Sequence, residues 1–181
     1  MKTISRIFAI LLIAVIPVLS YAQEEGLPNR LEITQIEIND GQTELEVFEL
    51  LKSSGEKSYW LSVGHLGIGD DIIQIQFDPI FELFIPLGDD LEEAQETMET
   101  IYSYFKKSSS NVLEVQGCLA PAFPNSEFET VKIVPRRYFL SRLLQFKIER
   151  DGYIRCNHIS RSEFGSLLSG LKFYRKLHPN E

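Results

Sequence analysis

The chain has 181 residues, of which 44% are hydrophobic and 24% are charged, and its formal net charge is −8. This composition is typical of a globular protein and excludes a low-complexity or disordered one. With 26 acidic residues against 18 basic ones, the overall charge argues against a nucleic-acid partner and provides no polybasic anchor for anionic lipid.

The first 22 residues have the pattern of a secretory signal peptide. Two cations precede an apolar run from Ile7 to Leu19, and Ser20-Tyr21-Ala22 provides a small-residue cleavage site. The run is interrupted by Pro17 and is shorter than the ~20 residues that a membrane-spanning helix needs. We therefore expect cleavage after Ala22, a periplasmic or secreted location, and no membrane span after signal removal. Because cleavage of the leader would remove two cations, the mature residues 23–181 carry a net charge of −10.

The segment after the leader alternates apolar and polar residues, which indicates strands with one buried face. The alternation over residues 31–38 slips by one position at Thr34-Gln35, and such a slip is typical of a β-bulge. Asp40-Gly41 favours a turn into a returning strand over residues 45–50, and residues 59–66 form a third strand.

Two more strands are expected to form a hairpin over residues 73–85. A three-residue loop at Asp78-Pro79-Ile80 places Ile75 opposite Leu83 and gives one coherent apolar face. A two-residue loop would split that face. We therefore predict that the chain reverses direction at Pro79.

Two amphipathic helices are predicted, each with a cap at its N-terminus. The first opens at Gly88-Asp89-Asp90 with an acidic N-cap, and the second begins at a capping box formed by Ser160 and Glu163. Each has an apolar stripe at helical spacing that is expected to face the core: Leu91, Ala94, Met98, Ile101, Tyr102 and Phe105 in the first, and Phe164, Leu167, Leu168, Leu171 and Tyr174 in the second.

Between the helices, strands are predicted over residues 112–119, 127–134 and 138–149, followed by a hairpin at Arg150-Asp151-Gly152. A two-residue turn would place Ile148 opposite Arg155, whereas a three-residue loop places Ile148 opposite Ile154 and Phe146 opposite Cys156. We favour the three-residue loop.

These elements predict an α+β fold, with a curved, mainly antiparallel sheet of roughly eight strands and the two amphipathic helices packed on one face. The mature length suits one core and hardly two, so residues 23–181 are expected to form a single domain.

No sequence pattern of a known catalytic or metal site is present. The chain has no His-Glu-x-x-His, Cys-x-x-Cys, Walker or EF-hand pattern, so no metal and no cofactor is expected. Ser-x-x-Lys occurs at Ser54 and again at Ser103, and two matches in one short chain show how readily that pattern arises by chance.

One stretch resembles a ligand-binding site in composition: Trp60, His65, Asp70 and Asp71, with three glycines between them. A histidine with two carboxylates can perform acid–base chemistry or hold a metal ion. We favour a structural interpretation, in which a strand ends in a glycine-rich turn and Trp60 belongs to the core.

Two further features have a functional and a structural interpretation. Arg136-Arg137 is a basic pair in an acidic protein, which is compatible with an anion site, but a solvated strand edge is the favoured interpretation. His158 is interpreted as a partly buried strand residue and not as a ligand.

The two cysteines, Cys118 and Cys156, leave two alternatives open. An oxidising compartment and an even count favour a disulfide. The alternation places Cys118 out of phase with Leu113 and Val115, so that only a bulge at Gly117 would turn it toward the core. Without that bulge the pair stays reduced, as two buried thiols.

Export, a single domain and the absence of catalytic patterns favour a non-catalytic binding or interaction module of the cell envelope. Its partner would be an envelope protein or an apolar ligand. The alternative is a small exported hydrolase with a site around His65, Asp70 and Asp71. Convergence of these three side chains in one cleft would distinguish the enzyme from the binding module.

Overall fold

The computed structural model describes residues 29–38, 43–52, 54–70, 76–119 and 127–179, so the expected leader lies outside the described residues. Within them, eight strands form one antiparallel sheet in sequential order, which confirms the predicted α+β fold. The strands are β1 (Asn29–Ile38), β2 (Thr43–Leu51), β3 (Lys57–Ile68), β4 (Gln76–Gly88), β5 (Leu113–Leu119), β6 (Phe128–Tyr138), β7 (Ser141–Arg150) and β8 (Tyr153–Ser160). The helices are α2 (Leu91–Ser103), the short 3-10 helix η1 (Tyr104–Lys106) and α3 (Arg161–Leu177).

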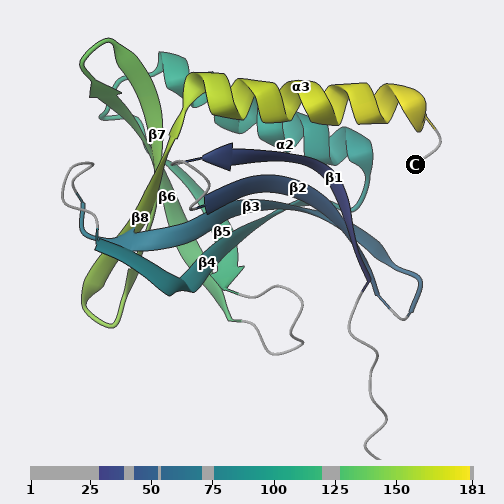
Figure 1. Ribbon diagram of the computed structural model, residues 1–181, viewed down its shortest axis with the longest axis horizontal. Coiled ribbons are helices and arrows are strands. Elements are labelled where there is room, and N and C mark those ends of the chain that lie inside the picture. The colour runs from purple at the N-terminus through teal and green to yellow at the C-terminus, as the bar shows by residue number, and fades with distance from the viewer. Residues whose placement is uncertain (1–28, 39–42, 53, 71–75, 120–126, 180–181) are drawn as a thin grey trace, which may run out of the picture.

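The sheet curves until its last strand pairs with an inner one. At the end of β3, Gly67 lies opposite Cys156 and Ile68 lies opposite Arg155 of β8. Strands β3 to β8 therefore form a closed ring of pairings, and β1 and β2 extend from β3 beneath α3 (Figure 1). The register of β1 against β2 shifts between Glu32 and Thr34, next to the predicted bulge.

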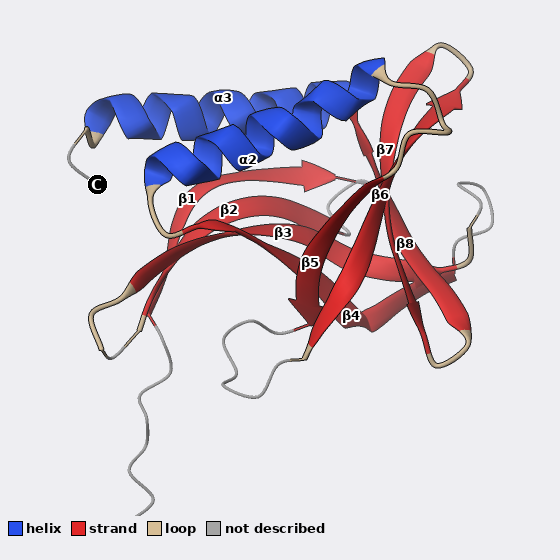
Figure 2. Ribbon diagram, turned by 180° about the vertical axis from the view of Figure 1, so that it is seen from behind, coloured by secondary structure: helices blue, strands red, loops and turns tan. Residues whose placement is uncertain are grey.

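The two long helices lie side by side across one face of the sheet (Figure 2). Their caps are the predicted ones: the carboxylate of Asp90 accepts hydrogen bonds from the backbone N–H groups of Glu92 and Glu93, both at 2.8 Å. Ser160 and Glu163 form a reciprocal capping box. Both apolar stripes are buried between the helices and the sheet, except for Tyr102 and Tyr174, which are half-buried.

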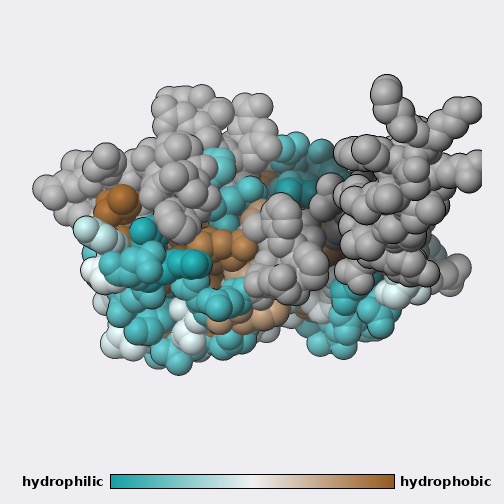
Figure 3. All heavy atoms as spheres, turned by 90° about the horizontal axis from the view of Figure 1, so that it is seen from below, coloured by the Kyte–Doolittle hydropathy of each residue, from teal (hydrophilic) through white to brown (hydrophobic). Residues whose placement is uncertain are grey.

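A second apolar cluster lies on the face of the sheet that points away from the helices. Its members are Phe48, Leu50, Trp60, Phe84 and Cys118. Figure 3 shows this side of the molecule, where apolar atoms reach the surface between polar ones. The sheet is therefore apolar on both faces, and alternate side chains of β2 and β3 contribute to different clusters.

The predicted reversal at Pro79 is wrong. The chain runs through Asp78-Pro79-Ile80 as one strand, β4, although residues 71–75 of the predicted hairpin lie outside the described residues. Between the pairs His65–Glu82 and Gly67–Phe77, β4 advances five residues while β3 advances two. The three additional residues form a bulge in β4, which accommodates the proline without a turn because a bulged residue needs no ladder hydrogen bond.

The favoured register of the β7–β8 hairpin is also wrong. Arg150 lies opposite Tyr153, so that the loop has two residues, Asp151 and Gly152, with φ angles of 54° and 76°. Aspartate tolerates the left-handed conformation that this tight turn requires. Ile148 consequently lies opposite Arg155, and Cys156 lies opposite Lys147, on the other face of the sheet from Ile148.

Candidate functional site

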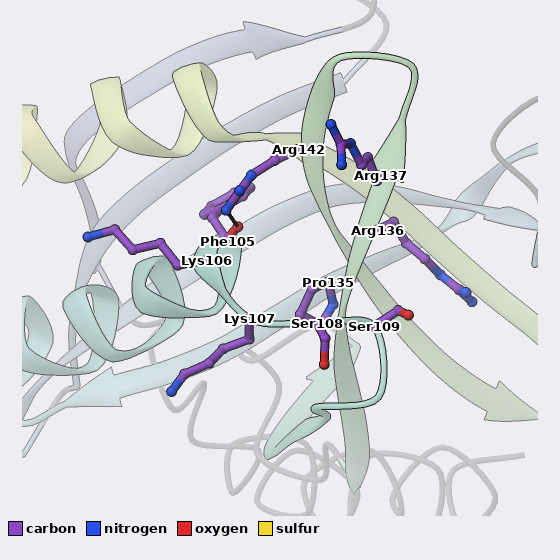
Figure 4. Close-up of a pocket in the computed structure, with 9 residues that line it drawn as sticks. All are labelled: Phe105, Lys106, Lys107, Ser108, Ser109, Pro135, Arg136, Arg137 and Arg142. Atoms are coloured by element: carbon purple, nitrogen blue, oxygen red, sulfur yellow. Dashed lines mark hydrogen bonds between the residues drawn. The ribbon is translucent and has the colours of Figure 1, made fainter.

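A cavity of about 590 Å³ opens between η1 and the β6–β7 hairpin (Figure 4). Five of its nine lining residues are cationic and none is acidic. We call it the basic groove, and its lining residues are Phe105, Lys106, Lys107, Ser108, Ser109, Pro135, Arg136, Arg137 and Arg142. The local charge is therefore opposite to that of the whole chain, whose net charge is −8.

The cations of the basic groove come from three places in the chain. Lys106 and Lys107 end the helical segment, Arg136 and Arg137 lie near the end of β6, and Arg142 lies at the start of β7. The pairing of β6 with β7 places Arg137 directly opposite Arg142. Like charges that face each other across two strands are destabilising. Figure 4 shows that their side chains point apart, with Arg142 directed at Phe105, and an anion bound near the pair would reduce the repulsion further.

Arg142 fixes the hairpin to the helical layer. Its guanidinium donates a hydrogen bond to the backbone oxygen of Phe105, at 3.1 Å, and Phe105 is buried in the main core. The η1 backbone and the hairpin are thereby held against each other on the two sides of the basic groove (Figure 4).

Arg136 is the cation with the most internal partners. Its Nε donates to Gln145 Oε1 at 3.0 Å, and its Nη2 lies 3.6 Å from the carboxylate of Asp70. In the described part of the chain, Lys106, Lys107 and Arg137 form no ion pair, so their charges remain available to a ligand. Figure 4 shows the two lysines and Arg136 pointing to opposite sides of Pro135.

The residues singled out by composition have separate structural roles. Trp60 belongs to the second cluster: its ring stacks on Phe128, and its Nε1 donates to Ser58 Oγ at 2.9 Å. Asp70 is held by β7, where its side chain accepts hydrogen bonds from Gln145 at 2.9 Å and Lys147 at 3.4 Å. Asp71 lies outside the described residues.

His65 lies beside Glu82 of β4 in a polar cluster that sequence reasoning missed. Burial raises the pKa of Glu46 in this cluster, although the ion pair with Arg30 opposes that shift. Ser62 Oγ donates to Glu82 at 2.7 Å and accepts from the Gly64 N–H, so its hydroxyl is already engaged on both sides. Ser62 is also only 1% exposed, so the geometry does not present its hydroxyl to a substrate as a nucleophile.

Both cysteines are free thiols in the structure, in different surroundings. Cys118 belongs to the second apolar cluster, whereas Cys156 Sγ donates to the backbone oxygen of Gly69 at 3.1 Å. Burial raises the pKa of both thiols to about 11. Neither thiol has the low pKa of a reactive nucleophile. His158 lies half-buried on β8.

In the part of the chain that the structure describes, no three His, Cys, Asp or Glu side chains are grouped so that they could hold a metal ion. None of the described helices is long and apolar enough to cross a membrane. No protein family, curated protein or solved structure matches the chain.

Proposed function

We propose that this protein is a non-catalytic binding module, exported to the cell envelope, which binds anionic groups in the basic groove. The observation that carries the proposal is the gathering of five cationic side chains around one cavity in a chain of net charge −8. The leader-like pattern of the first 22 residues supports export.

The chemistry of the cations suits phosphate-like or carboxylate ligands. Arginine presents its N–H donors in a planar fork that matches these groups with two parallel hydrogen bonds. Arg137 and Arg142 lie opposite each other on β6 and β7, so an anion bound at this part of the hairpin lies near both cations. The acidic remainder of the surface repels anions and leaves the basic groove as the favoured place of approach.

The hydrolase alternative has less support from the geometry. Asp70 is engaged with Gln145, Lys147 and Arg136, whereas His65 lies beside Glu82 on a different strand. A general base must be within hydrogen-bond reach of the group that it activates, and that group must be accessible to substrate. The Ser62 hydroxyl, which donates to Glu82, is only 1% exposed.

Calorimetric titration with inorganic pyrophosphate at low ionic strength tests the proposal. We expect the wild type to bind, and Arg137→Ser and Lys107→Ser each to weaken binding by about tenfold, the effect of losing one charge-assisted hydrogen bond. Lys52→Ser is the matched control, since it removes a cation from an exposed pair with Glu56, outside the basic groove. Absence of binding to the wild type, or equal affinities of all the variants, would overturn the proposal.

A further inference from the structure

The tip of the β6–β7 hairpin exposes large apolar side chains to solvent. The two-residue loop consists of Phe139 and Leu140, whose surfaces are 82% and 93% exposed. Tyr138, which precedes them, is also exposed. Figures 1 and 2 show this hairpin projecting past the end of α3, so that nothing in the described part of the chain covers its tip.

The backbone of the tip is unfavourable for the residue that occupies it. Phe139 has a φ of 52°, in the left-handed region, which is uncommon for a bulky side chain. The same sheet makes its β7–β8 turn with Asp151 and Gly152, which suit this conformation. The β6–β7 turn therefore combines an unfavourable backbone with two exposed apolar side chains, although the Phe139 ring makes an edge contact with Tyr138 at 4.7 Å between ring centroids.

We propose that the tip docks the protein on a bilayer that contains anionic phospholipid. Phe139 and Leu140 enter the boundary between headgroups and acyl chains, and Arg137 and Arg142 hold lipid phosphates. This inference rests on the proposed function, because the headgroup contacts require anion binding by the basic groove. It adds an apolar contact with the acyl chains and identifies a lipid bilayer as the surface that carries the anions.

The depth of each group along the hairpin matches a bilayer surface. Arg137 lies two residues behind Phe139, which corresponds to about 7 Å along an extended strand. Apolar groups of interfacial proteins enter a membrane by roughly 5–10 Å, so the arginines would lie at the level of the phosphates. A narrow tip with two projecting side chains provides little flat surface for a folded protein partner, whereas lipid adapts to its shape.

The charge of the protein selects the orientation of docking. A net charge of −8 opposes approach to an anionic bilayer in most orientations. Charges farther than a Debye length of about 8–10 Å are screened at physiological salt, so only groups near the tip act on the membrane. Arg137 and Arg142, each two residues from the exposed loop, satisfy that condition when the tip points toward the lipid. Binding is therefore expected to weaken as salt is raised.

Flotation with lipid vesicles tests the inference on protein purified after export, with its N-terminus verified by sequencing. We expect the wild type to float with vesicles of phosphatidylcholine mixed with phosphatidylglycerol, and not with phosphatidylcholine alone. The combined change Phe139→Ser and Leu140→Ser should weaken vesicle binding by about tenfold or more, because each side chain loses its apolar contact. The matched control is Tyr153→Ser, which removes an exposed aromatic side chain next to the opposite hairpin turn.

Pyrophosphate titration of the same variants separates this inference from the proposed function. The Phe139→Ser and Leu140→Ser change should leave pyrophosphate affinity unaltered, whereas Arg137→Ser should weaken both kinds of binding. Vesicle binding that is unchanged in the tip variant would overturn membrane docking while leaving anion binding intact. Loss of self-association in the tip variant without any vesicle binding would also overturn it, in favour of a second copy of the chain as the occupant.

A tryptophan at the tip provides a direct readout of insertion. The single natural tryptophan, Trp60, is buried and gives a constant background. We expect the emission of Phe139→Trp to shift to shorter wavelength on addition of phosphatidylglycerol vesicles. An unchanged emission spectrum with bound vesicles would show that the tip stays in water and would overturn the inference.

Discussion

Gly170 of α3 lies directly against Thr34 of β1. A Cβ atom at Gly170 would overlap Thr34 Oγ1 and would stand 2.9 Å from Thr34 Cβ, closer than side-chain carbons approach in folded proteins. The absence of a side chain at residue 170 therefore allows α3 to rest on the first strand, which pairs with the rest of the sheet only through β2.

Gly170→Ala is expected to destabilise the protein by about 1–3 kcal/mol, the usual effect of overpacking, although alanine favours a helix. Gly165→Ala is the matched control on the same helix, because its Cβ would lie at 3.4 Å from Tyr102, an ordinary contact. This second change should leave the free energy of unfolding in urea unaltered or raise it by up to about 1 kcal/mol. Equal effects of the two substitutions would contradict the close approach of α3 to β1.

Met98→Asp is expected to unfold the protein or nearly so. Met98 is fully buried at the centre of the α2 stripe, and an unpaired buried carboxylate costs several kcal/mol of a total stability of about 5–15 kcal/mol. Thr100→Asp places the same charge on the exposed side of α2 and should change the melting temperature little. A melting temperature of Met98→Asp close to that of the wild type would mean that this stripe faces solvent.

Both cysteines are expected to be reduced and slow to react in the folded protein. Burial raises the pKa of Cys118 and of Cys156 to about 11, so that little thiolate exists near neutral pH. Mass spectrometry after iodoacetamide treatment should show no label on the native protein and two labels after denaturation without reductant. A two-dalton deficit with no label after denaturation would establish the disulfide instead.

The raised thiol pKa values also predict how stability depends on pH. Between the ordinary thiol pKa of 9.0 and about 11, the folded protein keeps two protons that the unfolded chain releases. The free energy of unfolding should therefore fall as the pH rises through this window. The double change of Cys118→Ala and Cys156→Ala should remove this part of the decline.

Glu46→Gln is expected to alter the pH dependence of stability at the acidic end. Burial raises the pKa of Glu46 above 4.5, so the folded protein holds a proton there that the unfolded chain has lost. The wild type should consequently lose stability relative to Glu46→Gln as the pH rises through the raised pKa. Glu114→Gln, on the exposed side of β5, controls for the loss of one negative charge. A stability difference that does not vary with pH would contradict the buried position of Glu46.

N-terminal sequencing of the exported protein should begin at Gln23, because Ala22 ends the small-residue cleavage site. Recovery of intact Met1 from a membrane fraction would contradict both cleavage and export in a soluble form.

The regular elements of the fold were predictable because their apolar residues recur with the period of a strand or a helix. The two errors of register occurred where period alone does not decide. At Pro79 a bulge preserves the strand through a sequence that is typical of a turn. At Asp151 a non-glycine residue adopts a positive φ, which allows the shorter loop.

The basic groove was visible in the sequence only as the pair Arg136-Arg137. Its other cations lie about 30 residues away along the chain or across a hairpin, and only pairing of β6 with β7 brings Arg142 opposite Arg137. The net charge of the chain does not reveal this arrangement, because it gives no information on where the individual charges lie in the fold. Trp60 and His65 were singled out because their residue types are rare in this chain. In the fold, Trp60 belongs to the second apolar cluster and His65 lies in a polar cluster beside Glu82.

The contact between β3 and β8 has a consequence for how the chain folds. It joins residues that are 89 positions apart, Gly67 and Cys156, and the second partner belongs to β8, the last of the described strands along the chain. Loop closure over such a distance is slow, and until it occurs the edges of β3 and β8 that this contact joins remain open to pairing with other chains. A chain that ends after the β7–β8 turn should therefore aggregate, and the ring of paired strands is expected to close only after β8 has left the ribosome.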